Sequence, residues 1–173
     1  SRSKNLFLPV LLLTAMAATE VGAEDTPWIR AAYWDSRYPA EWAGTGEATR
    51  DALQAAGYEI LDADQLKTWM TARISDKKLS VVVFIKDIAP DTVLETETSG
   101  CTLRKYLNAG GKIVFYADIP FYNQGHVDNT KTTWDTAGST AVLGFNAASG
   151  TWDVGAAVTF TEAGVRWGLT KTW

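Results

Sequence analysis

Short runs of apolar residues recur along the chain from residue 28 onward. The clearest is SVVVFI at residues 80–85, a continuous and largely β-branched run that is typical of a strand covered on both faces. Shorter apolar segments at residues 29–34, 58–61 and 113–116 predict further strands, and residues 158–160 predict a last one. We expect the strand at residues 113–116 to be buried as well.

Between these strands the apolar residues follow a helical period. After Leu66, for example, apolar side chains recur at i+3, i+4 and i+8. The expected helices cover residues 47–56, a segment capped by Asp62 or Asp64, a segment capped by Thr98 or Ser99 that ends at the glycine pair 110–111, and residues 133–143. Strands that alternate with helices predict right-handed βαβ units, and therefore an α/β fold with a mainly parallel sheet.

The first 23 residues differ from the rest. Arg2 and Lys4 precede an apolar run at residues 6–18, and small residues follow at Val21-Gly22-Ala23. These are the parts of a secretory signal peptide, and the run is shorter than the roughly 20 residues that span a bilayer. We therefore expect residues 1–23 to be a signal peptide, residues 24–173 to form one domain, and the protein to be secreted or periplasmic without a membrane span.

Composition excludes several classes of protein. The 173 residues carry a net charge of −4, so the basic surface of a nucleic-acid-binding protein is missing. A single Cys and a single His rule out a disulfide framework within the chain and a Cys/His zinc cluster. The glycine motifs of dinucleotide and phosphate-binding loops are also absent, so the sequence predicts no cofactor.

One segment resembles a known family. Residues 103–114 read LRKYLNAGGKIV, which is similar to the helix-Gly-Gly-strand signature of the class I glutamine amidotransferase-like superfamily. That superfamily includes ThuA-like domains and the trimerisation-like domains of some β-galactosidases. Residues 142–145, VLGF, resemble a helix exit in the same proteins. The resemblance covers roughly residues 28–145 and implies a flavodoxin-like, three-layer αβα sandwich, whose C-terminal part we expect to be incomplete here.

The catalytic residues of that superfamily are missing from the matching positions. In its catalytic members, the strand after the Gly-Gly pair leads into a turn with a nucleophilic Cys, which a His and a Glu assist. Here the turn reads YADIP at residues 116–120, Cys101 precedes the third helix, and His126 lies in the following loop. Because thiolate chemistry needs a thiolate beside a base, the resemblance implies a domain without amidotransferase activity. The common Ser hydrolase motif is absent too.

Three aspartates follow three of the predicted strands: Asp35, Asp87 and Asp118. The carboxyl ends of parallel strands meet at the edge of the sheet where ligands bind. There the three carboxylates could hold Mg²⁺ or Ca²⁺, or provide an acid and a base for a hydrolase that uses Asp35 or Asp118. The alternative is structural, because Asp after a strand commonly caps the next helix or forms an Asx turn.

Aromatic side chains gather in the same loops. The candidate ligand-binding residues are Trp34, Asp35, Tyr38, Trp42, Asp87, Asp118, Tyr122 and His126, with Asn123 and Gln124 as further hydrogen-bonding groups. Rings beside polar groups are typical of a sugar-binding surface. The alternative is that these rings pack the loops.

Three functions remain after this reasoning. The first is an exported, non-catalytic glutamine amidotransferase-like domain that binds a carbohydrate, another small molecule or a partner, alongside other domains of the same chain. The second is an Asp-based hydrolase, with or without a divalent cation. The third is a structural or oligomerising domain, which the resemblance to β-galactosidase domains allows.

Overall fold

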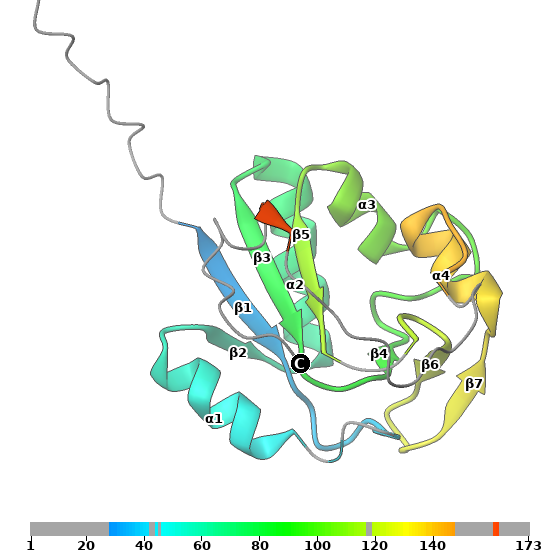
Figure 1. The fold of residues 1–173 in the computed structure, drawn as a ribbon, viewed down its shortest axis with the longest axis horizontal. Coiled ribbons are helices and arrows are strands. Elements are labelled where there is room, and N and C mark those ends of the chain that lie inside the picture. The colour runs from blue at the N-terminus through cyan, green and yellow to red at the C-terminus, as the bar shows by residue number, and fades with distance from the viewer. Residues whose placement is uncertain (1–27, 42–43, 45, 117–118, 148–160, 163–173) are drawn as a thin grey trace, which may run out of the picture.

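The computed structural model describes residues 28–41, 44, 46–116, 119–147 and 161–162. Its central sheet contains β1 (Ile29–Tyr33), β2 (Glu59–Leu61), β3 (Ser80–Phe84) and β5 (Lys112–Phe115), all parallel and in the order β2-β1-β3-β5 (Figure 1). Helices α1 (Glu47–Ala55), α2 (Ala63–Asp76) and α3 (Thr102–Asn108) connect these strands. The predicted α/β fold with a mainly parallel sheet is confirmed, and this strand order is that of flavodoxin-like proteins.

Side chains that alternate along β1 and β3 pack on opposite faces of the sheet. On one face, Tyr33 and Phe84 belong to the larger apolar core, which α2 and α3 complete; α2 lies behind the sheet in Figure 1. On the other face, Ala32 and Val83 contact Leu53 of α1. The prediction that residues 80–85 are covered on both faces is therefore confirmed.

The expected burial of residues 113–116 is only half correct. Ile113 and Phe115 pack against the main core, but Val114 and Tyr116 are 51% and 57% exposed. The reason is position, since β5 is the last strand of the four and its outer face is not covered by α1. An apolar run does not by itself distinguish an edge strand from a central one.

The glycine pair after α3 has a direct packing role. The Tyr106 ring is fully buried, and a Cβ atom on Gly111 would lie 2.2 Å from its Cζ atom. Gly110 has a φ of +98°, which a side chain would strain. The Tyr106 hydroxyl lies 3.1 Å from Ser80 Oγ and 3.2 Å from the Lys112 carbonyl oxygen. The tyrosine and the glycine pair therefore join α3 to β3 and β5.

Helix α2 begins with a capping box. The Asp62 side chain accepts a hydrogen bond from the Gln65 backbone N–H at 2.8 Å, and the Gln65 side chain accepts one from the Asp62 N–H at 2.9 Å. Of the two caps that the sequence allows, Asp62 is therefore correct. The helix buries one face, made of Ala63, Leu66, Trp69 and Met70.

Helix α3 begins later than expected, and the predicted caps Thr98 and Ser99 are wrong. Its N-cap is Cys101, whose side chain makes no capping hydrogen bond. Glu95 supplies the missing acceptor instead: its carboxylate accepts from the Thr102 backbone N–H at 2.8 Å and from the Thr102 hydroxyl at 2.6 Å. A cap that comes from a loop seven residues away leaves no mark in the local sequence pattern.

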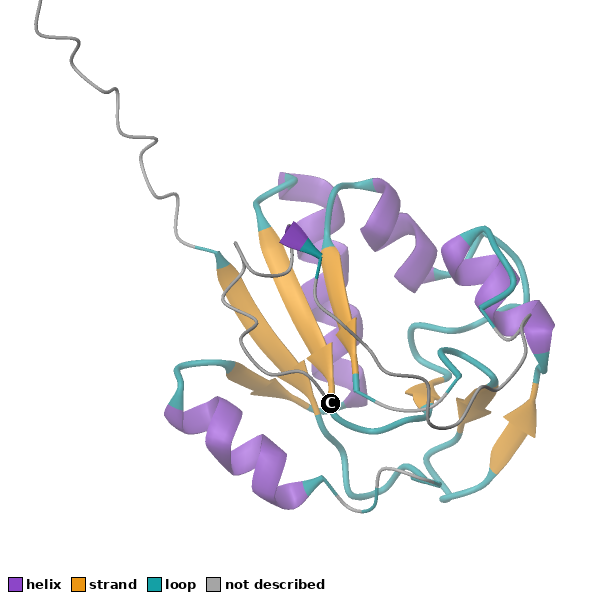
Figure 2. Ribbon diagram, viewed as in Figure 1, coloured by secondary structure: helices purple, strands orange, loops and turns teal. Residues whose placement is uncertain are grey.

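A second, smaller sheet follows the first. It consists of β4 (Ala89–Pro90), β6 (Asn123–Gly125) and β7 (Lys131–Thr133), in the order β4-β6-β7, with β4 and β6 parallel and β6 and β7 antiparallel (Figure 2). Helix α4 (Thr136–Leu143) starts three residues after the predicted residue 133, because β7 occupies residues 131–133. The strand expected at residues 158–160 and the signal peptide expected at residues 1–23 lie outside the described residues.

Candidate functional site

Two pockets lie near the carboxyl ends of β1 and β3, and one of them reaches the second sheet. In the sheet, β2 lies on one side of β1, and β3 and then β5 lie on the other. The direction in which strands are added therefore reverses between β1 and β3. In open α/β sheets such a switch point is where ligands bind. Asp35 and Asp87 follow these two strands, as predicted, whereas Asp118 and Trp42 lie outside the described residues.

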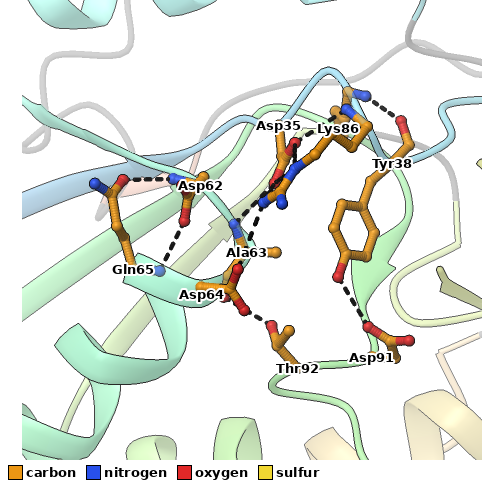
Figure 3. Close-up of polar contacts among 10 residues, drawn as sticks. Asp35, Tyr38, Asp62, Ala63, Asp64, Gln65, Lys86, Asp91 and Thr92 are labelled. Carbon is orange, nitrogen blue, oxygen red and sulfur yellow. Dashed lines mark hydrogen bonds and ion pairs between the residues drawn. The ribbon is translucent and has the colours of Figure 1, made fainter. Parts of the chain in front are cut away.

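Asp35 is fully engaged by its own surroundings (Figure 3). Its side chain is 4% exposed and forms an ion pair with the Arg37 guanidinium at 2.7 Å, together with hydrogen bonds from Arg37 Nε and the Arg37 backbone N–H. It also accepts a hydrogen bond from the Ala63 backbone N–H, the first residue of α2, at 3.1 Å. We call the described residues after β1, 34–41, the β1 loop. Asp35 therefore holds the β1 loop against the start of α2.

These contacts fix the charge of Asp35. Burial alone raises the pKa of this carboxyl group, but the hydrogen bonds from Arg37 and Ala63 outweigh burial and lower it. A carboxylate held in its ionised form is unsuited to donate a proton near neutral pH, and a metal ion would have to displace Arg37. The contacts favour the structural alternative for this residue.

A pocket lies next to Asp87, and we call it the edge pocket. It has a volume of about 400 Å³ and is lined by Glu41, Asp87, Ile119, Tyr122, Asn123, Lys131 and Thr133. The two predicted ligand-binding residues Asp87 and Tyr122 therefore line one cavity. The other wall comes from β6 and β7 of the second sheet.

Hydrogen bonds link most of the pocket wall. Asp87 Oδ1 accepts from the Glu41 backbone N–H at 2.9 Å. The Glu41 carboxylate accepts from the Asn123 side-chain amide at 2.9 Å and forms an ion pair with Lys131. Asn123 in turn accepts from the Thr133 hydroxyl at 3.0 Å. The network sets carboxylate, amide, ammonium and hydroxyl groups around one space.

Lys86 lines a second hollow near the ends of β1 and β3. Its side chain is nearly buried and donates to the Tyr38 carbonyl oxygen, as Figure 3 shows, and Nζ lies 5.9 Å from the centre of the Trp34 ring. Burial lowers the pKa of the Lys86 ammonium, while Asp35 and Asp87 act in the opposite direction. The second hollow, of about 390 Å³, includes Trp34, Tyr38 and Lys86 in its lining.

The predicted aromatic residues divide between two pockets: Trp34 and Tyr38 line the second hollow, and Tyr122 lines the edge pocket. The Tyr38 ring is 4% exposed and its hydroxyl donates to Asp91 at 3.0 Å. The Trp34 ring lies 4.2 Å from the Arg50 guanidinium. The burial of Tyr38 in the main core is what the packing alternative predicts for this residue.

Of the remaining polar residues predicted to bind a ligand, only some line the edge pocket. Asn123 lines the edge pocket, but the Gln124 side-chain amide donates to the Leu94 carbonyl oxygen at 2.6 Å. His126 lies 2.9 Å from Asp91 on one side and 2.9 Å from Thr132 on the other. His126 therefore belongs to a separate group of side chains.

Cys101 is a free cysteine of the main apolar core. It is 1% exposed within the main apolar core, and burial raises the pKa of its thiol. A buried thiol with a raised pKa is a poor nucleophile.

Among the residues that the structure describes, no three His, Cys, Asp or Glu side chains are arranged to hold a metal ion. The predicted metal site of Asp35, Asp87 and Asp118 includes one residue outside that set. Within the described ranges, every helix is too short or too polar to cross a lipid bilayer.

Sequence reasoning missed two charged members of the edge pocket. Glu41 and Lys131 are 90 residues apart in the chain and meet only because the second sheet folds against the β1 loop. The strand KTT that carries Lys131 is polar and three residues long, so periodicity offers no signal for it.

A profile of the MJECL34 family matches residues 30–173, which include the whole edge pocket. The chain belongs to the MJECL34 family. It is also 37% identical over 105 residues to a protein titled "Uncharacterized protein MJECL34" from Methanocaldococcus jannaschii. That alignment covers 57% of this chain and 36% of the relative, so the MJECL34 family includes a protein much longer than the matched part. No solved structure matches the chain.

Proposed function

We propose that this protein is a ligand-binding domain without amidotransferase activity, and that it binds a hydroxyl-rich molecule such as a carbohydrate in the edge pocket. The observation that carries the proposal is the mixture of groups in that pocket. Carboxylate acceptors from Glu41 and Asp87 lie around the same space as the donors of Asn123 and Lys131. Sugar hydroxyls both donate and accept, so they suit such a mixed lining.

The pocket also contains an apolar surface. The Tyr122 ring lines it and is half-buried, and Ile119 lies beside it in the lining. A flat ring next to paired donors and acceptors provides a face for the C–H groups of a sugar while the polar groups take the hydroxyls. The volume of about 400 Å³ falls within the range of about 300–1,000 Å³ that is usual for small-molecule sites.

The resemblance to the glutamine amidotransferase-like superfamily is part of the proposal. The segment that carries it joins α3 to β3 and β5 through Tyr106 and Gly111, in a sheet of flavodoxin-like order. The only cysteine is buried in the core, which supports a domain of this superfamily without thiol catalysis.

We also propose that the domain is exported and acts beside further domains. The basic and apolar pattern of residues 1–23 supports export. The greater length of the curated relative supports a setting in a larger protein.

The hydrolase alternative rests on Asp35 or Asp118, and of the two only Asp35 lies within the described residues. Asp35 is occupied by Arg37 and by the start of α2, so its removal is expected to weaken the fold rather than stop a reaction. The structural or oligomerising alternative is an outcome of the binding test below.

Calorimetry with cello-, xylo-, malto- and chito-oligosaccharides tests the proposal. We expect at least one of them to bind, and Asn123→Ala to weaken its binding about tenfold, because the substitution removes an amide that lines the pocket and holds the Glu41 carboxylate. Lys131→Gln is expected to weaken binding too, whereas Lys105→Gln on the exposed side of α3 is the matched control. Absence of heat with all four classes would contradict carbohydrate binding and leave the structural alternative.

A further inference from the structure

A row of hydrogen bonds outside the edge pocket joins Asp91, His126 and Thr132. Asp91 follows β4, His126 follows β6, and Thr132 is the middle residue of β7. His126 Nδ1 lies 2.9 Å from Asp91 Oδ2, and Nε2 lies 2.9 Å from Thr132 Oγ1. The imidazole therefore lies between a carboxylate and a hydroxyl group, and each of its nitrogens has one partner.

The partners determine the direction of the hydrogen bonds. An ionised carboxylate only accepts, so Nδ1 of a neutral His126 carries the proton that Asp91 receives. Nε2 then has a free lone pair, and the Thr132 hydroxyl donates to it. The hydroxyl donates to the imidazole and the imidazole donates to the carboxylate. The same order of nucleophile, general base and orienting carboxylate recurs in catalytic triads on unrelated folds.

A buried phenol holds the acid in place. The Tyr38 hydroxyl donates to Asp91 Oδ1 at 3.0 Å, and that tyrosine ring is 4% exposed (Figure 3). The other carboxylate oxygen is thereby left to face His126. The carboxylate is oriented before any ligand arrives, which general-base catalysis requires.

The Asp91, His126 and Thr132 side chains are accessible to solvent and lie outside the edge pocket. Thr132 is exposed, and the His126 side chain is 29% exposed. Lys131 and Thr133 line the edge pocket, and Thr132 lies between them, so strand alternation places it on the opposite face.

We propose that Thr132, His126 and Asp91 form a second site that hydrolyses carboxylic esters. Thr132 Oγ1 forms a bond to the acyl carbon while its proton passes to His126 Nε2. The ester C–O bond then breaks, and the leaving alcohol takes that proton. Water repeats the sequence on the acyl-threonine, which releases the acid and restores the hydroxyl group.

The test uses p-nitrophenyl acetate near neutral pH, with p-nitrophenolate release as the rate and peptide mass spectrometry to locate the acetyl group. We expect an acetyl group on Thr132, and His126→Gln to slow its formation about 100-fold, the usual contribution of a general base. Thr132→Ser is expected to retain the reaction, and Thr132→Val to abolish it.

The control is Thr130→Val on the same hairpin, whose hydroxyl bonds to Asp128 rather than to the histidine. It is expected to react like the parent protein. Circular dichroism checks that each variant folds. If Thr132→Val does not fold, the single variants Thr132→Ser and His126→Gln still test the proposal. Acetylation of Thr132 at an unchanged rate in His126→Gln, or no acetyl group on Thr132 in the parent protein, would overturn the proposal.

Discussion

Different interactions stabilise each of the two sheets of this protein. Neighbouring strands β1 and β3 pair over five residues, and the side chains between them and the helices are almost all apolar. In the second sheet, β4 and β6 pair over only two residues, and side-chain hydrogen bonds such as Gln124 to Leu94 supplement the short ladder. The comparison indicates that the first sheet supplies stability and the second supplies the polar groups with which a ligand can interact.

Aromatic rings connect the two regions. Phe121, which precedes β6, lies 4.9 Å from Phe115 and 6.2 Å from Phe84, measured between ring centres. The loop that carries the edge pocket is therefore anchored to the main core, although its own strands are short. The following predictions test this division, from the largest expected effect to the smallest.

Phe84→Ala should have the largest effect on stability. The ring is fully buried and contacts Tyr33, Phe115 and Phe121, so its removal opens a cavity at the junction of the two sheets. We expect the free energy of unfolding to fall by roughly 3–5 kcal/mol, as measured by urea denaturation. Val114→Ala, at an exposed position of β5, is the control; an equal loss there would contradict the division.

Asp35→Asn should cost about 2 kcal/mol, because an amide cannot accept both guanidinium hydrogen bonds from Arg37 and keep the contact with Ala63. Urea denaturation gives the loss, and calorimetry on the same variant gives the affinity for the oligosaccharide. We expect the affinity to change little. A stable Asp35→Asn variant that no longer binds would instead place Asp35 in the site.

Glu95→Gln tests the unusual cap of α3 through its dependence on pH. Burial raises the pKa of Glu95, but hydrogen bonds from Lys67 and Thr102 lower it from 4.5 to about 2. Because the pKa in the folded state lies below the unfolded value, the carboxylate stabilises the fold above pH 4.5 and loses this effect as the pH falls toward about 2. The urea midpoints of the parent and Glu95→Gln should therefore differ at neutral pH and converge in acid. Glu97→Gln is the control, and a difference independent of pH would contradict the explanation.

Lys131→Gln should have the smallest effect on stability. Its ion pair with Glu41 is partly exposed, so we expect the free energy of unfolding to change by less than about 1 kcal/mol. A loss as large as that of Asp35→Asn would show that the polar network holds the fold together, against the comparison made above.

Most of the first sheet is predictable from the sequence because buried elements leave an apolar pattern, although the exposed side chains of β5 are not. Residues 80–85 form a continuous apolar run and the helix after Asp62 has a helical apolar period, and the structure agrees with both predictions. The Gly111 position also fits, since only a residue without Cβ leaves room for the Tyr106 ring.

The second sheet could not be predicted in this way. Its strands have two or three residues and are mostly polar, so neither period nor composition marks them. The cap of α3 by Glu95 and the meeting of Glu41 with Lys131 depend on contacts between distant parts of the chain. Asp35 shows the opposite error: its position after a strand is informative, but only the structure shows that Arg37 engages it.

The most direct test of the central claim is an amide chemical-shift titration of the isotope-labelled protein with the same four classes of oligosaccharide. If the second sheet and the β1 loop carry the binding site, the amide signals of Glu41, Asn123 and Lys131 should shift with a common saturation curve, while those of α1 and α3 stay unchanged. Saturable shifts centred on α1 or α3, with the signals of β6 and β7 unmoved, would contradict the account.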